Sequence, residues 1–291
     1  MVFKQVNTLD ALPPFPSQRM IVTDLDGTLL HSERVLSAAN RATLEALGDQ
    51  GILRVIATGR SLYSARKVLS PSFPIDYLIF SSGAGIIDWP TQHMLVAHSL
   101  SAEEVTQASH ALIQHELDFM LHHPIPDNHY FSYRTTGREN PDFFRRYELY
   151  RPFGAPLETS QPPVQPACQF VAISPKHPDA LRKYDALKAH LQTLKVIRTT
   201  SPIDGESLWI EIFPTTVSKA LASEWLARKY HIDRSKIFAL GNDYNDLDLL
   251  QWAGKSAVVK NAPAELQAIY WTVTTNDDDG FSEAVRLWLN K

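Results

Sequence analysis

Two aspartates separated by one residue follow an apolar run, and they are the residues of this chain with the clearest chemical potential. The run 20–23 (Met-Ile-Val-Thr) leads into Asp24 and Asp26, and Gly27 comes next. Such a run predicts a short buried strand, and the glycine lets the chain turn away after it. Two carboxylates held this close repel each other unless a cation lies between them or one stays protonated. The stretch predicts a metal site, with a surface turn capped by Asp24 as the alternative.

Two further predicted strands also end in small or polar residues. A buried strand is predicted at 52–57 and ends at Thr58, Gly59 and Arg60, and the strand predicted at 77–82 ends with Ser82. A helix predicted from Ser37 to about residue 50 joins the first two strands, which implies a parallel pair with a right-handed crossover. Ligands collect at the carboxyl ends of such strands. Thr58 and Gly59 can therefore hold an anion, or Thr58 simply caps the next helix.

The last third of the chain adds a lysine and a second acidic loop. Ser218 is a predicted N-cap for a helix that opens with Lys219, and the apolar run 236–240 ends at Gly241. The loop 242–246 (Asn-Asp-Tyr-Asn-Asp) follows that run directly. Asp246 lies four residues after Asn242, at the predicted start of the next helix. There it can hold Lys219 or a metal-bound water.

Alternation of strands and helices predicts an α/β fold in two parts. Residues 1–85 and 207–291 show the βα series of a mostly parallel, Rossmann-like sheet, whereas 86–206 mixes short strands, helices and prolines. We expect 86–206 to be a separate α+β domain inserted into the first. The segment 151–166 carries five prolines and is expected to be a rigid loop.

Composition excludes several classes of function. The 291 residues are 44% hydrophobic, and 28 Lys and Arg face 32 Asp and Glu, so no strong positive field attracts nucleic acid or anionic membrane. Cys168 is the single cysteine, and no run of about 18 apolar residues is present. We expect a cytoplasmic protein without disulfides that acts on a small molecule. Cys168, His122 and His123 are expected to be structural.

Together these motifs resemble the signatures of the haloacid dehalogenase-like (HAD) superfamily. The stretch 211–219 and the tail 261–280 are similar to its Cof-type branch, in which a large α/β cap is inserted into the core. The resemblance implies a Mg²⁺-dependent phosphatase of small phosphorylated metabolites, with sugar phosphates as the expected class and an aspartyl-phosphate as intermediate. Within this resemblance Asp24 is the nucleophile, Asp26 is the general acid and base, and Lys219 offsets the negative charge.

The resemblance also assigns the remaining site residues. The phosphate- or substrate-binding candidates are Thr58, Gly59, Arg60, Ser82 and Asn245. The metal-binding candidates are Asp24, Asp26, Asn242, Asp243 and Asp246. Two positions depart from the family pattern: Asn242 stands where an aspartate is usual, and Ser82 stands where an asparagine is usual.

Two other functions stay open on the sequence. A sugar phosphomutase uses the same aspartyl-phosphate and passes the phosphoryl group to a second hydroxyl. A non-catalytic protein that binds phosphometabolites on a decayed HAD scaffold is the second alternative, and the neutral Asn242 is the feature that favours it.

Overall fold

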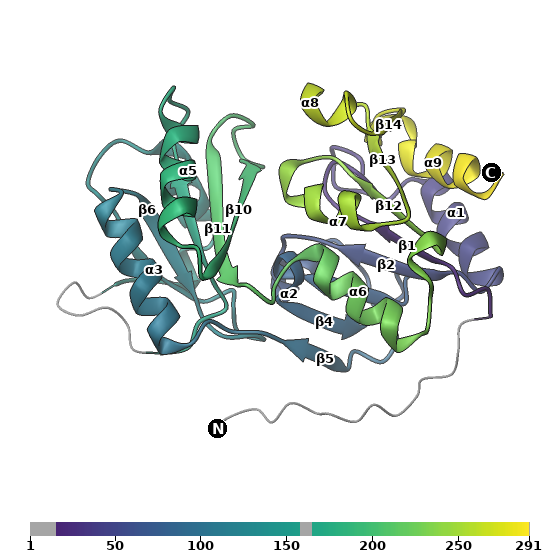
Figure 1. The fold of residues 1–291 in the computed structure, drawn as a ribbon, viewed down its shortest axis with the longest axis horizontal. Coiled ribbons are helices and arrows are strands. Elements are labelled where there is room, and N and C mark those ends of the chain that lie inside the picture. The colour runs from purple at the N-terminus through teal and green to yellow at the C-terminus, as the bar shows by residue number, and fades with distance from the viewer. Residues whose placement is uncertain (1–15, 158–164, 291) are drawn as a thin grey trace. The chain divides into compact units, whose positions relative to one another are not determined.

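The chain forms two compact units (Figure 1). The core unit runs to Val96 and resumes at Ser218, and the inserted unit is Ala97–Val217. The computed structural model describes residues 16–157 and 165–290. Every helix in those two ranges is too short or too polar to span a bilayer.

The core unit is built on one eight-stranded sheet with the order β14-β13-β12-β1-β2-β3-β4-β5. In that order the strands are Trp271–Val273, Lys255–Val259, Ile237–Gly241, Met20–Thr23, Leu53–Ala57, Tyr77–Phe80, Gly85–Asp88 and Met94–Ala97. Neighbours from β14 to β3 pair in parallel, and β4 pairs with β3 in the antiparallel sense. This mostly parallel, Rossmann-like sheet confirms the expected fold class.

Helices cover both faces of the core sheet. They are α1 (Ala38–Asp49), α2 (Leu62–Ala65), α6 (Lys219–Lys229), α7 (Leu247–Trp252), α8 (Ala264–Gln267) and α9 (Gly280–Leu289). Leu226 of α6 and Leu249 of α7 pack with Val22 on one face. Phe238, whose register partner is the neighbouring Ile21, stacks on Trp288 of α9 with ring centroids 5.3 Å apart. Because β1 is buried on both faces, its apolar run has no polar alternation.

The inserted unit has its own six-stranded sheet with the order β10-β11-β9-β6-β7-β8. In that order the strands are Leu194–Thr200, Leu208–Pro214, Gln169–Ser174, Asp118–His122, Phe131–Arg134 and Gly154–Pro156. Its helices are α3 (Ala102–Gln114), α4 (Pro141–Leu149) and α5 (Ala180–His190). Phe170 and Ala172 belong to the apolar cluster that includes residues of α3 and α5, whereas Val171 and Ile173 pack with Phe143 of α4. The period of two follows from the pleat of β9.

The division between the units differs from the boundaries expected at 85 and 206. β4 and β5 continue the core sheet, and β11 pairs with β9 and β10 in the sheet of the inserted unit. The apolar alternation of β11 indicates a strand but does not indicate which sheet it joins. The proline-rich segment also differs from the expected loop, because β8 ends in Pro156 at the sheet edge, where a missing N–H is tolerated. Residues 158–164 of that segment lie outside the described residues.

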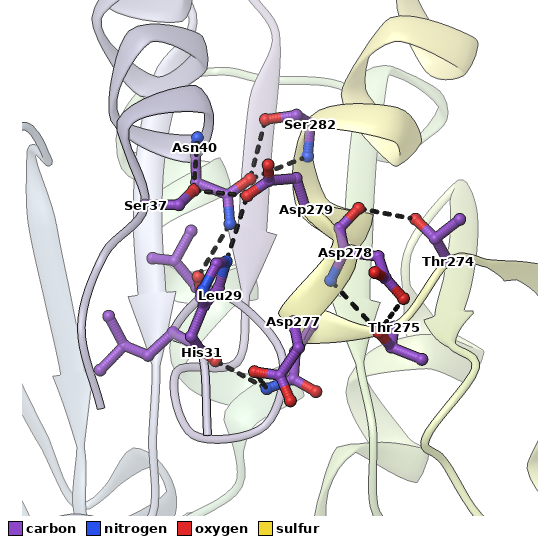
Figure 2. Close-up of polar contacts among 12 residues, drawn as sticks. Leu29, His31, Ser37, Asn40, Thr274, Thr275, Asp277, Asp278, Asp279 and Ser282 are labelled. Carbon is purple, nitrogen blue, oxygen red and sulfur yellow. Dashed lines mark hydrogen bonds and ion pairs between the residues drawn. The ribbon is translucent and has the colours of Figure 1, made fainter. Parts of the chain in front are cut away.

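The loop after β1 is held by the C-terminal segment of the chain (Figure 2). Ser37, the N-cap of α1, donates to Asp279 over 2.5 Å, and Asn40 accepts from the backbone N–H of Ser282 over 3.2 Å. The Asn40 side chain also donates to the Leu29 carbonyl over 3.0 Å. Asn276 donates to the Leu30 carbonyl in the same way. These contacts fix the path of the chain just after the two aspartates.

We predict that Gly83→Ala destabilises the protein and lowers any activity of the core unit. Gly83 has φ +109°, and a Cβ there would lie 2.3 Å from the Ser218 carbonyl oxygen. A side chain would strain the turn and push away the start of α6, where Lys219 lies, at a cost of at least about 1 kcal/mol. Chemical denaturation measures the loss. Gly137→Ala, where φ is +78° but no atom lies within 4 Å of the added Cβ, is the control for backbone strain alone.

We predict that His122 makes the inserted unit sensitive to acid. Burial, with Arg146 as the next cause, lowers the pKa of His122 from 6.5 to about 3. Between these two pKa values His122 binds a proton in the unfolded chain but not in the folded one. The free energy of unfolding that His122 contributes is therefore fully present above pH 6.5 and falls as the pH drops toward 3. His122→Gln should flatten the slope of unfolding free energy against pH between 6.5 and 4. The exposed His110→Gln is the control, and equal slopes for His122→Gln and the wild type would contradict the prediction.

Candidate active site

The polar residues singled out in the sequence follow adjacent strands of the core sheet. β12, β1, β2 and β3 are consecutive neighbours, so the loops after their carboxyl ends lie side by side. Backbone bonds extend the pairing into these loops. Asp24 donates to the Leu240 carbonyl over 2.9 Å, Thr58 to Ile79 over 2.9 Å, and Ser82 to Thr58 over 3.0 Å. Asp24, the predicted nucleophile, and Thr58, the predicted anion-binding residue, therefore lie at the ends of neighbouring strands.

Lys219 is buried between two carboxylates. Its Nζ donates to Asp24 Oδ1 over 2.7 Å and to Asp246 Oδ1 over 2.6 Å. Lys219 is 1% exposed and Asp246 is fully buried. An ammonium group taken out of water needs such partners, because its desolvation costs several kcal/mol. The interaction joins β1, the start of α6 and the loop after β12. From the sequence, these three segments were expected to meet only because of the family resemblance.

The electrostatics of this cluster leave the carboxylates short of positive charge. Burial alone would lower the pKa of the Lys219 ammonium, but Asp24 and Asp246 raise it above its ordinary value. Burial raises the pKa of Asp24 from 3.8 to about 7; Lys219 opposes this shift, and Asp246 and Asp26 add to it. The pKa of Asp24 is raised although Lys219 is in contact with it, so a further cation beside the ionised Asp24 would be stabilised there.

Asp246 organises the loop after β12. Its Oδ2 accepts from the backbone N–H groups of Asn242 over 2.9 Å and of Asp243 over 3.1 Å, while its Oδ1 accepts from Lys219. A Cβ at Gly241 would lie 2.6 Å from the Asp246 carboxyl, so only glycine fits at the end of β12. Both oxygens of Asp246 are engaged, and its position suits it to hold the lysine and the loop.

The other members of this loop have different positions. Asp243 caps the 3₁₀ turn Tyr244–Asp246, with its side chain accepting from the Tyr244 N–H over 2.8 Å. Asn245 is half-buried within the turn. The Asn242 amide oxygen accepts from the Thr28 hydroxyl over 3.1 Å, which brings it to the loop that carries Asp24 and Asp26. The side-chain oxygen of Asn242 thus reaches the β1 loop.

The oxygen atoms around Asp24 are of the kind that Mg²⁺ binds. Within residues 16–157 and 165–290 no group of three or more His, Cys, Asp or Glu side chains is placed to hold a metal. A Mg²⁺ site here would draw on the Asp24 carboxylate and the Asn242 amide oxygen, with backbone carbonyl, water and substrate oxygens as the remaining ligands. Mg²⁺ commonly takes one or two carboxylates and leaves its other positions to water and phosphate. The donor set and the deficit of positive charge at Asp24 fit that ion.

Asp26 is paired with Arg60. The guanidinium Nε donates to Asp26 Oδ2 over 2.6 Å, and Nη2 donates to Oδ1, also over 2.6 Å. Asp26 is the more accessible partner, with its side chain 36% exposed against 15% for Arg60. From the sequence Arg60 was expected to contact the substrate, and its pairing with Asp26 was not anticipated. Arginine and aspartate 34 positions apart carry no local pattern; the adjacency of β1 and β2 is the signal that could have indicated it.

The predicted phosphate-binding residues lie around the same strand ends. The Thr58 hydroxyl accepts from the Arg60 backbone N–H over 3.1 Å, and Gly59 lies between them in the turn. Ser82 is fully buried in a left-handed backbone conformation with φ 54°. The structure thus brings Asp24, Thr58 and Ser82 onto three adjacent loops of one unit.

Comparisons with known proteins identify the family of the chain. Residues 21–285 match the family described as haloacid dehalogenase-like hydrolase. The chain is 27% identical over 286 residues to the 5-amino-6-(5-phospho-D-ribitylamino)uracil phosphatase YwtE of Bacillus subtilis, covering 90% of this chain and 95% of that protein. A second phosphatase of the same name and organism, YcsE, is 26% identical over 276 residues, covering 93% of this chain and 96% of that protein.

Solved structures show the same fold. BT1666, a HAD phosphatase of Bacteroides thetaiotaomicron, superposes with a TM-score of 0.73 at 22% identity, covering 96% of this chain and 98% of that one. The HAD subclass IIB sugar phosphatase BT4131 gives a TM-score of 0.73 at 16% identity, covering 93% and 98%. With the family match over most of its length, this chain belongs to the haloacid dehalogenase-like hydrolases, in the Cof-type branch that its motifs resemble.

Proposed function

We propose that the protein is a Mg²⁺-dependent phosphatase that hydrolyses small phosphorylated metabolites through an aspartyl-phosphate on Asp24. The observation that carries the proposal is the buried Lys219 bridging Asp24 and Asp246 at the carboxyl ends of β1 and β12. A carboxylate attacks a phosphate dianion poorly unless nearby positive charge neutralises both groups. Lys219, which is buried with Asp24, supplies part of that charge.

The proposed reaction has two halves. In the first, an Asp24 carboxylate oxygen attacks phosphorus, the bond from phosphorus to the ester oxygen breaks, and Asp26 gives a proton to the departing oxygen. In the second, Asp26 takes a proton from water as the water oxygen attacks phosphorus, and the bond to Asp24 breaks to release inorganic phosphate. Thr58 and the Gly59 N–H hold the phosphoryl oxygens, with Ser82 and Asn245 as further candidates for contact with the substrate.

Asp24, the Asn242 amide oxygen and the Asp26 backbone carbonyl would hold Mg²⁺. The ion supplies positive charge that polarises the phosphoryl group and offsets the charge of the attacking carboxylate. Asp246 was also a metal candidate in the sequence, but its carboxylate already accepts from Lys219 and from two backbone N–H groups. These contacts favour a role for Asp246 in holding Lys219 and the loop, rather than the metal. Asp243 caps the turn that follows it, which favours a structural role for that residue as well.

The substrate class is proposed from the relatives. Proteins named as phosphatases of a phosphoribitylamino uracil are similar to this chain over nearly its whole length, and a sugar phosphatase shares its fold. We infer a phosphomonoester of a sugar or sugar alcohol, with the inserted unit acting as the cap that selects it. We also propose a cytoplasmic location, which is supported by the single cysteine, Cys168, being free and buried.

Replacing Asp24 tests the nucleophile. Asp24→Asn should lower the rate of phosphate release from a panel of sugar phosphates and p-nitrophenyl phosphate by about 10³-fold or more, because the amide cannot form the acyl-phosphate. The exposed Asp49→Asn at the end of α1 is the control and should keep the wild-type rate. Undiminished turnover in Asp24→Asn would remove Asp24 from the mechanism. Isomerised sugar phosphate without free phosphate would indicate a phosphomutase, and no turnover of any ester by the wild type would indicate a binding protein.

Replacing Asn242 tests the metal site. Mg²⁺ should raise the melting temperature of the wild type, and the chelator EDTA should abolish both that shift and the activity. Asn242→Asp adds a carboxylate ligand, so the Mg²⁺ concentration for half of the thermal shift should fall by about 10-fold. The exposed Gln251→Glu, on α7, controls for charge alone. Equal Mg²⁺ dependence of the wild type and Asn242→Asp would place the ion elsewhere.

A further inference from the structure

The two-point ion pair between Arg60 and Asp26 has a geometry that can fix the orientation of the Asp26 carboxylate. Nε and Nη2 of the arginine face the two carboxylate oxygens separately, each at 2.6 Å. A bidentate pair of this kind fixes the plane and the rotation of a carboxylate, which a single point charge does not do. Asp26 is the partly exposed member of the pair, so without Arg60 its side chain would be free to rotate.

Arg60 is itself anchored by neighbouring elements. Its Nη1 donates to the carbonyl and the hydroxyl oxygens of Ser64, both over 3.2 Å. Its backbone N–H donates to the Thr58 hydroxyl over 3.1 Å, and its carbonyl accepts from the Ser81 N–H over 2.8 Å. The residue is therefore held by α2 and by the loops after β2 and β3. The guanidinium is a rigid part of the core unit.

We propose that Arg60 is a positioning residue that holds the ionised Asp26 as the base of the second half-reaction, an inference that rests on the proposed phosphatase function. A bidentate contact needs both oxygens free of protons, which is the state of Asp26 after it has given its proton to the leaving group. While Asp26 still carries the proton for the first half-reaction, the arginine keeps only its contact with the unprotonated oxygen. Each carboxylate oxygen has two acceptor sites, and the arginine uses one on each. The remaining sites can receive the proton of the attacking water. The proton then resides on Asp26 while the bond from phosphorus to Asp24 breaks.

A positioning role for Arg60 and a substrate-binding role affect different steps of the reaction, so kinetics can distinguish them. Loss of a phosphate contact weakens substrate binding and raises KM. Loss of support for the acid harms esters of aliphatic alcohols more than p-nitrophenyl phosphate, because the basic alkoxide needs a proton as it leaves. Loss of support for the base slows only the hydrolysis of the aspartyl-phosphate, which is the same intermediate for every ester.

The test compares Arg60→Gln and Arg60→Lys with the wild type. In Arg60→Gln we expect kcat to fall by about 10²-fold, to the same value for p-nitrophenyl phosphate and for an alkyl phosphate. Rapid mixing with p-nitrophenyl phosphate should give a burst of one nitrophenolate per enzyme, and mass spectrometry of the quenched protein should find phosphate on Asp24. Arg60→Lys should recover part of the rate because it keeps one of the two contacts.

A matched control lies in the same sheet. Arg54 makes the same two-point contact with Asp76, through Nε over 3.0 Å and Nη2 over 2.8 Å, on β2 but without a site residue as partner. Arg54→Gln should lower the melting temperature and give no burst. A rise in KM with unchanged kcat in Arg60→Gln, or a larger loss for alkyl than for aryl esters, would overturn the inference. Failure of the wild type to form any phosphoenzyme would instead overturn the proposed function.

Discussion

Burial of the Lys219 ammonium is the constraint on which the rest of the core unit depends. The group has left water almost completely and has two carboxylate partners, Asp24 and Asp246. Breaking such a buried interaction by removing one partner costs about 3–5 kcal/mol, because the remaining charge is left uncompensated. Three segments far apart in the sequence must meet for it to form. The strand order that places β12 beside β1, and the contact of Ser218 with Gly83, bring them together.

Three aspartates of the same chemical type acquire different properties from their hydrogen bonds. Asp246 is enclosed, and both of its oxygens are held by Lys219 and by backbone N–H groups, so it shapes the loop. Asp26 is partly exposed and is held in one plane by Arg60. Asp24 lies between these extremes: it is buried, it contacts one lysine, and its pKa is raised by burial toward neutrality. Environment, and not residue type, separates the acid that we propose as a support from the two that we propose to react.

Local features of the sequence predicted local structure well. The apolar run before Asp24 forms β1, and Ser37 and Ser218 cap α1 and α6 as expected, because each of these signals involves residues a few positions apart. Features that depend on distant partners were not accessible. The alternation of β11 is the same whether it joins either sheet, and the pairing of Arg60 with Asp26 depends on which strands are neighbours. Strand pairing is set by long-range packing, which no short window of sequence contains.

The neutral side chain at Asn242 is consistent with the charge balance of the site. Asp24, Asp26 and Asp246 carry more negative charge than Lys219 and Arg60 offset, and a phosphomonoester brings two further negative charges. A fourth acid at 242 would bind a divalent cation more strongly, but it would also repel the phosphoryl oxygens that must approach Asp24. An amide keeps an oxygen donor, held in place by Thr28, without that repulsion. On the proposed function, an amide at 242 therefore trades some cation affinity for easier entry of the anionic substrate, so this residue does not by itself indicate a decayed site.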